Sequence, residues 1–210
     1  MSRRELLAAG LCATILPVPA LALEPHFPID WQGAPETPEI ATALAAQIAL
    51  IEALPIDPAI IAFFATQRIA VDTMPGSMSR IGPDGIHFER RVVPADNPVL
   101  LHEMLHLYHL LRLPDGYENA EILRFYDSVL AAGLYPPGAY MLSHPIEFFA
   151  MTASAVLYGQ LSRPPFSRAE VEAKSPELYA WIVREFGLRI NTASRILAYS
   201  IKQKNYETMY

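Results

Sequence analysis

The feature that most constrains the fold is a pair of histidines in an apolar segment. His102-Glu103-Met104-Leu105-His106 lies within a run rich in leucine that extends from Val99 to Leu111. A helix start at Asp96-Asn97-Pro98 and a stop at Pro114-Asp115-Gly116 predict a helix over 98–113. In that helix the four-residue offset places both imidazoles on one face, one turn apart. Because the segment is apolar nearly all round, we expect it to be buried.

Two imidazoles in a buried helix cost free energy unless something pairs with them. A divalent metal ion does so, since two neutral imidazole nitrogens can bind one zinc at about 2.0–2.1 Å. Glu103 projects to the side, where its carboxylate can act as general base toward a water that the zinc makes acidic. The motif therefore predicts a hydrolase with one Zn²⁺ per chain, held by His102 and His106. Two core histidines beside a surface glutamate are the alternative interpretation.

A catalytic zinc needs a third protein ligand. Cys12 is the only cysteine and lies in the N-terminal leader described below, so this ligand must be His, Asp or Glu. Glu147 is a candidate because it stands near the start of a second apolar helix, predicted over 144–159. His144, three residues earlier on the same face, is its rival. His109 lies further along the first helix and is expected behind the metal or in the core.

A family resemblance distinguishes these candidates. Tyr140 and Glu147-Phe148-Phe149-Ala150, taken with the HExxH helix, resemble the signature of the anthrax-lethal-factor-type gluzincins, zinc metallopeptidases that include many small bacterial members. The resemblance spans roughly residues 86–159. It implies a zincin-like fold, Glu147 as the third zinc ligand, and a peptidase activity. It also implies that the Tyr140 hydroxyl faces the metal and stabilises the reacting oxyanion, a role that suits a phenol donor.

The sequence departs from that family at two positions. Leu105 stands where members often have glycine, and we expect it to narrow the site. Met151 stands where an acidic residue often follows the alanine, and we expect a ligating histidine to lose a hydrogen-bond partner there.

Strands in the first half followed by helices predict an α+β fold. The predicted helices cover 40–54, 58–67, 98–113, 119–132, 144–159 and 175–186. The predicted strands are 68–73 and a hairpin over 79–93, which turns at Pro83-Asp84-Gly85. Ile86 and Phe88 then share one face. The strand 86–93 precedes the metal helix and can pair with an extended peptide as an added strand, which favours a peptide or protein substrate.

Residues 1–22 are predicted to be a signal peptide. Arg3 and Arg4 precede an apolar run that ends in Ala20-Leu21-Ala22, so we expect cleavage before Leu23. The start resembles a twin-arginine signal, and an ordinary secretory signal or a retained anchor are the alternatives. We expect an exported protein, in the periplasm or outside the cell, without a membrane span once the signal is removed. Residues 23–210 are predicted to form a single zincin-like domain.

The formal net charge of -6 and the scattered basic residues argue against a nucleic-acid partner. Three alternatives to a peptidase stay open. They are a hydrolase of other substrates or a latent precursor, an exported protein with a purely structural zinc, and a di-iron helical bundle. The bundle needs two Glu-x-x-His pairs, whereas only Glu103 and His106 form one here.

Overall fold

The computed structural model describes residues 27–32, 37–73, 76–94 and 96–190. The predicted signal peptide over 1–22 and the C-terminal tail over 191–210 lie outside these residues. Within the described ranges, no helix combines the length and the apolar character that a bilayer span requires.

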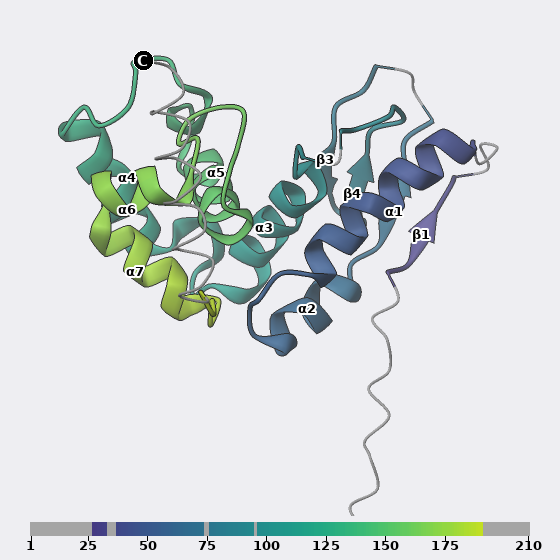
Figure 1. Ribbon diagram of the computed structural model, residues 1–210, viewed down its shortest axis with the longest axis horizontal. Coiled ribbons are helices and arrows are strands. Elements are labelled where there is room, and N and C mark those ends of the chain that lie inside the picture. The colour runs from purple at the N-terminus through teal and green to yellow at the C-terminus, as the bar shows by residue number, and fades with distance from the viewer. Residues whose placement is uncertain (1–26, 33–36, 74–75, 95, 191–210) are drawn as a thin grey trace, which may run out of the picture.

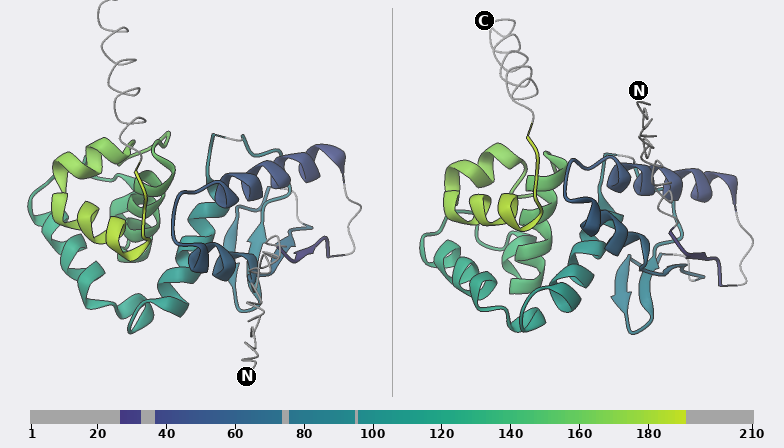
Figure 2. Two further views of the ribbon diagram at one scale, coloured as in Figure 1. Left: turned by 60° about the horizontal axis from the view of Figure 1, so that its bottom comes forward. Right: turned by 90° about the horizontal axis from the view of Figure 1, so that it is seen from below.

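The strands are β1 (Ile29–Asp30), β2 (Ile69–Val71), β3 (Arg80–Gly82) and β4 (Gly85–Phe88). The α-helices are α1 (Pro38–Glu52), α2 (Pro58–Ala65), α3 (Val99–Arg112), α4 (Ala120–Ala131), α5 (Pro145–Tyr158), α6 (Arg168–Lys174) and α7 (Pro176–Glu185). Two short 3₁₀ turns are η1 (Gly116–Glu118) and η2 (Tyr140–Leu142). Figures 1 and 2 show α3 between two groups, with the strands, α1 and α2 on one side and α4 to α7 on the other. The predicted α+β fold class is confirmed.

The strands form one mixed sheet in the order β1-β2-β4-β3. β2 is parallel to both β1 and β4, and β3 returns antiparallel to β4 through the predicted hairpin. Ile86 and Phe88 are fully buried, as the alternation predicted. β4 is paired on both edges, however, so the expectation that this strand receives an added substrate strand is wrong. The hairpin places β3 outside it, at the sheet edge that faces α3 in Figure 1.

The helix that carries the HExxH motif lies in the core along most of its length. Its first turns bury five apolar side chains, namely Leu100, Leu101, Met104, Leu105 and Leu107. Leu110 and Leu111 are 42% and 57% exposed, so the last turn of α3 is not buried on all sides as the rest of the helix was expected to be. The partner of α3 is α5, whose residues from Phe148 to Leu157 are all buried. Packing of these two apolar helices is what brings their polar residues together.

A buried amide fixes the start of α3. Gln47 of α1 is 1% exposed, and its Nε2 donates to the carbonyl oxygens of Pro94 at 3.2 Å and Asn97 at 2.9 Å. Its Oε1 accepts from the backbone N–H of Leu100 at 3.1 Å. Because buried polar groups are stable only when they are hydrogen-bonded, this side chain ties the first turn of α3 to α1.

Most predicted helices are confirmed within two residues at each end, with two differences in detail. The N-cap of α5 is His144, which was predicted as the first residue of the helix, and its Nδ1 accepts from the backbone N–H of Ile146 at 3.3 Å. The short helix α6 was not predicted, because its seven residues bury only Val171 and carry no apolar period. Asn119 caps α4, accepting from the N–H of Ile122 at 3.1 Å.

Candidate metal centre

The two motif histidines face one another on α3. Their Nε2 atoms are 3.0 Å apart, and their ring centroids are separated by 4.5 Å with nearly perpendicular planes. His106 is buried at 5% exposure, and His102 is partly buried. The predicted arrangement, with both imidazoles on one helix face, is present.

Glu147, in the first turn of α5, lies next to these two rings. Its Oε2 lies 3.2 Å from Nε2 of His102 and 3.6 Å from Nε2 of His106. Burial acts to raise the pKa of the Glu147 carboxyl, but the two imidazoles outweigh burial and hold this pKa well below its usual range. The carboxyl is therefore an anion at neutral pH, as a metal ligand must be.

The three donor atoms fit a zinc ion. All lie within 4.8 Å of one another. Ligands placed 2.0–2.2 Å from a tetrahedral zinc are about 3.3–3.6 Å apart, close to the separations of 3.0, 3.2 and 3.6 Å found here. Oε2 of Glu147 is buried and makes no hydrogen bond within the described residues. His102, His106 and Glu147 thus form a group that can hold a metal ion.

His144, the rival third ligand, is not in this group. It caps the helix that Glu147 begins, so its Nδ1 is already used by the backbone. The group that can hold a metal, among the residues the structure describes, consists of His102, His106 and Glu147.

Glu103 follows His102 on α3 and lines a pocket with it. It is only 6% exposed. Burial raises the pKa of this carboxyl to about 7, with His106 opposing the rise and Glu147 adding to it. A carboxyl with a pKa near neutrality is suited to exchange protons, which is the property required of a general base.

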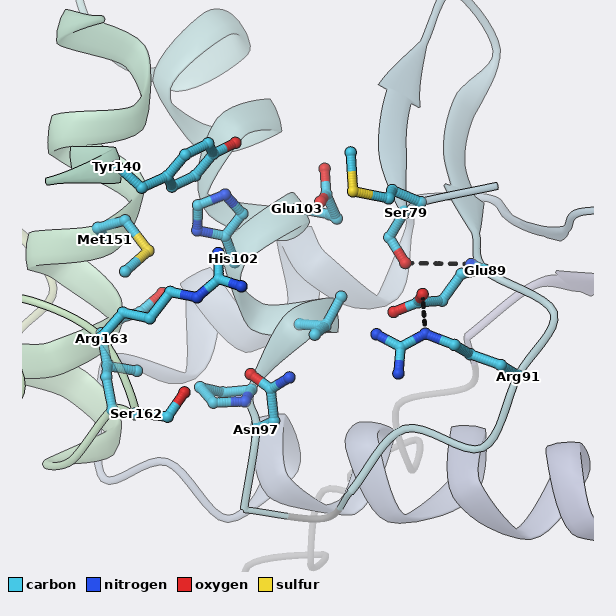
Figure 3. A pocket seen from close by; sticks show the side chains of 15 residues that line it. Ser79, Glu89, Arg91, Asn97, His102, Glu103, Tyr140, Met151, Ser162 and Arg163 are labelled. Carbon is cyan, nitrogen blue, oxygen red and sulfur yellow. Dashed lines mark hydrogen bonds and ion pairs between the residues drawn. The ribbon is translucent and has the colours of Figure 1, made fainter. Parts of the chain in front are cut away.

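Tyr140 stands at the mouth of the same pocket, in η2. Its side chain is 47% exposed, and Figure 3 shows its ring next to His102. Burial, and after it the negative charge of Glu147, raises the pKa of the phenol to about 12. The hydroxyl is therefore protonated near neutral pH and can donate a hydrogen bond.

The two departures from the family signature have different surroundings. Leu105 is fully buried and is not among the pocket-lining residues, so it contributes to the core rather than narrowing this pocket. Met151 lines the pocket beside His102 (Figure 3). Nδ1 of His106 is buried without a hydrogen-bond partner among the described residues. A histidine that binds a metal usually donates from its second nitrogen, and no such acceptor is found for His106 among the described residues.

His109 lies behind the ligands, as expected. It is fully buried, with its ring against Phe149 and Tyr117. Burial lowers the pKa of this imidazole to about 4, and His106 adds to the effect. Tyr117 was not predicted as a neighbour of the site. Burial raises its pKa to about 12, and the charges of Glu103 and Glu147 reinforce that rise.

The pocket has a volume of about 280 Å³ and extends from His102 to the loop that follows α5. Of the residues that line it, sequence reasoning singled out His102, Glu103, Tyr140 and Met151 and missed the rest. The residues missed lie just before β3, just after β4, just before α3 and in that loop, namely Ser79, Glu89, Arg91, Asn97, Ser162 and Arg163. Nothing local in the sequence marks these polar residues as lining one pocket with His102.

Comparison with known proteins supports the fold. No family model matches the sequence, and no curated protein matches it. Among solved structures, the chain is similar to the Pro-Pro endopeptidase from Paenibacillus alvei, with a TM-score of 0.54 and 14% sequence identity. The match covers 75% of this chain and 97% of that one. At this identity the likeness is evidence for the fold alone, and it shows that the chain shares the α+β fold of that endopeptidase.

Proposed function

We propose that the protein is a zinc-dependent peptidase. The observation that carries the proposal is the convergence of His102, His106 and Glu147 on one point, with Glu103 beside it and a pocket in front. Three protein ligands and an accessible remaining position are the mark of catalytic rather than structural zinc sites. The fold shared with an endopeptidase agrees with this assignment.

Each residue has a chemical role in this proposal. His102, His106 and Glu147 hold the ion, which when bound lowers the pKa of water and polarises a carbonyl. The Glu103 carboxylate takes a proton from the water that attacks the scissile carbonyl, and then delivers it to the departing nitrogen. The Tyr140 hydroxyl donates to the carbonyl oxygen as negative charge develops on it, an interaction made in the transition state.

The open edge of the sheet favours a peptide as the substrate. β3 is an edge strand beside the pocket, and Ser79, just before it, lines the pocket with Glu103. An extended peptide added to this edge passes the catalytic group with its backbone already hydrogen-bonded. The proposal includes membership of the anthrax-lethal-factor-type gluzincins, and export directed by residues 1–22.

The proposal is tested by metal analysis and a peptide library. We expect one zinc per chain in the purified protein and cleavage of peptides from a mixed library. Glu103→Gln should keep the zinc and lose about 10²–10⁴-fold in turnover, since it removes only the proton acceptor. Glu118→Gln, an exposed carboxylate on η1, is the matched control and should behave as wild type.

Two results would contradict the proposal. Two irons per chain would point to a di-iron protein. Zinc binding without any Glu103-dependent cleavage would point to a structural metal site or to hydrolysis of another class of substrate.

A further inference from the structure

The part of the pocket away from Glu103 is lined by hydrogen-bond donors. In Figure 3, Arg163, Ser162 and Asn97 lie below His102, whereas Glu103 lies to its right. Arg163 and Ser162 come from the loop between α5 and α6, and Asn97 comes from the segment that leads into α3. The two ends of the pocket therefore differ in charge, with the guanidinium of Arg163 at one end and, at the other, the carboxyl of Glu103 and the ion pair of Glu89 with Arg91.

Arg163 differs from the arginines near it. Arg91, which lines the same pocket, is paired with the buried carboxylate of Glu89. Arg80 of β3 is paired with the buried Asp72 at 2.7 Å. Arg163 has no ion pair within the ranges that the structure describes. Its charge is close enough to the site to act on Tyr140, whose pKa it lowers against the larger effects of burial and Glu147.

The loop that presents Arg163 is held by its own backbone. The N–H of Phe166 donates to the carbonyl of Arg163 at 2.8 Å, and the N–H of Leu161 donates to the carbonyl of Phe166 at 2.6 Å. Gln160 and Ser167 form an antiparallel bridge at the base of the loop. Arg168 then anchors the loop to α5 by donating to the carbonyls of Val156 and Leu157. Because the backbone is fixed, a ligand does not have to order it on binding.

A second observation points to a ligand here. Ser154 of α5 lines the pocket and is 1% exposed, yet its Oγ has no hydrogen-bond partner in the described part of the chain. The hydroxyl of Thr152, two residues earlier on the same helix, donates a hydrogen bond to the carbonyl of Phe148 at 2.7 Å. A buried hydroxyl without a partner is costly, and a ligand in the pocket can supply one.

We propose that this end of the pocket selects substrates that carry a carboxylate near the scissile bond, and that Arg163 is the residue that recognises it. The guanidinium binds a carboxylate with two parallel hydrogen bonds, and the neutral donors Ser162 and Asn97 lie beside it. In the rest of the pocket the charge of Arg91 is paired with Glu89 and Glu103 adds a carboxyl, so a single carboxylate fits this charge pattern and a polyanion does not. This inference rests on the proposed peptidase function, because it names the substrates of that site.

The carboxylate has two possible sources in a peptide, an acidic side chain or a free C-terminus. Four matched peptides of one apolar sequence separate them. One carries an internal Glu and a C-terminal amide, one carries Gln and an amide, one carries Gln and a free C-terminus, and one carries Lys and an amide. Their dissociation constants are measured by fluorescence polarisation on the Glu103→Gln protein, so that binding is observed without turnover.

We expect at least one carboxylate peptide to bind about 10- to 100-fold more tightly than the peptide with Gln and an amide, as a charge-assisted contact gives. Arg163→Gln should remove that preference, Arg163→Lys should keep part of it, and Arg163→Glu should shift it to the Lys peptide. Arg163 is exposed, so these variants should fold, which unfolding curves will verify. Arg124→Gln, on the outer face of α4, is the matched control and should leave the preference unchanged.

The outcomes separate this inference from the peptidase proposal. Equal binding of all four peptides, or a preference that survives Arg163→Gln, overturns the carboxylate site even if the wild type is an active peptidase. A preference that depends on Arg163 in a protein that cleaves no peptide retains the site and removes the peptidase function. The same four peptides, offered to the wild type as substrates, report on cleavage.

Discussion

Oε2 of Glu147 lies 3.2 Å from Nε2 of His102 across the contact between α5 and α3. Neither helix contains a complete ligand set, because α3 supplies two imidazoles and α5 supplies the carboxylate. The apolar faces that pack these helices together are therefore also what assembles the metal centre. We therefore expect a substitution that disturbs the packing of either helix to lower the affinity for the metal ion first.

Replacing Glu147 with alanine tests this dependence. Loss of an outer-shell partner already costs about 10- to 100-fold in metal affinity, so loss of a direct ligand should cost more. We expect Glu147→Ala to weaken zinc binding by more than about 100-fold, measured by competition with a chromogenic chelator. Glu52→Ala, at an exposed position on α1, is the control. Unchanged zinc affinity in Glu147→Ala would transfer the third ligand to another residue.

Replacing Tyr140 with phenylalanine tests the oxyanion role. The substitution removes the hydroxyl and leaves the ring beside His102, so substrate binding should change little. Loss of one oxyanion donor lowers kcat by about 10²–10³-fold, and the partial exposure of Tyr140 favours the lower end of that range. Steady-state kinetics should show the fall in kcat with a similar KM. Tyr158→Phe, also on the α5 side of the molecule, should match wild type, and a Tyr140→Phe variant that does the same would exclude the role.

The histidine pair of the candidate site could be predicted because it is local. His102, Glu103 and His106 lie within one turn and a half of a helix, whose boundaries Pro98 and Pro114 mark in the sequence. Glu147 also begins a strongly apolar helix. Its choice over His144 came from a family resemblance, and the structure gives the physical reason, since the His144 ring is used as a helix cap.

The remaining features depend on contacts between distant segments. β1 has two residues and exists because it pairs with β2, which no local pattern reveals. In the sheet, β3 rather than β4 lies at the open edge. The alternation of apolar and polar residues does not tell which strand of a hairpin pairs with the rest of the sheet. Arg163 is one charged residue in a loop, and its importance follows only from the pocket into which it extends.

Replacing Gln47 tests whether its side chain holds α3 in place. Gln47→Met keeps the side-chain volume but leaves the N–H of Leu100 without its partner, whereas the carbonyls of Pro94 and Asn97 lose one donor and keep their backbone hydrogen bonds. A buried group left unsatisfied costs about 1–3 kcal/mol, so we expect the free energy of unfolding in urea to fall by about that amount. Gln160→Met, at an exposed position, should change it by less than about 0.5 kcal/mol. Equal stability of the two variants would mean that α3 is positioned without this amide.

His109 should make the stability of the metal-free protein depend on pH. Burial lowers the pKa of this imidazole from 6.5 to about 4 in the folded chain. Above pH 6.5 both the folded and unfolded states carry it neutral, so it adds no pH dependence there. Between about pH 6.5 and 4 the unfolded state takes up the proton and the folded state does not, so stability falls as the pH falls. The shift corresponds to a loss of about 3 kcal/mol in total.

The measurement is the free energy of unfolding against pH, made in the presence of a chelator so that competition between protons and metal for His102 and His106 plays no part. His109→Phe fills the same apolar surroundings, formed by Phe149 and Tyr117, without a titratable ring. The difference between the wild-type and His109→Phe curves should therefore be flat above pH 6.5 and should slope between 6.5 and 4. Carboxylates that titrate in the same range contribute equally to both proteins and cancel. A difference that stays flat across the whole range would show that His109 is protonated as readily in the folded chain as in the unfolded one. The pKa of the buried imidazole would then not be lowered by its surroundings.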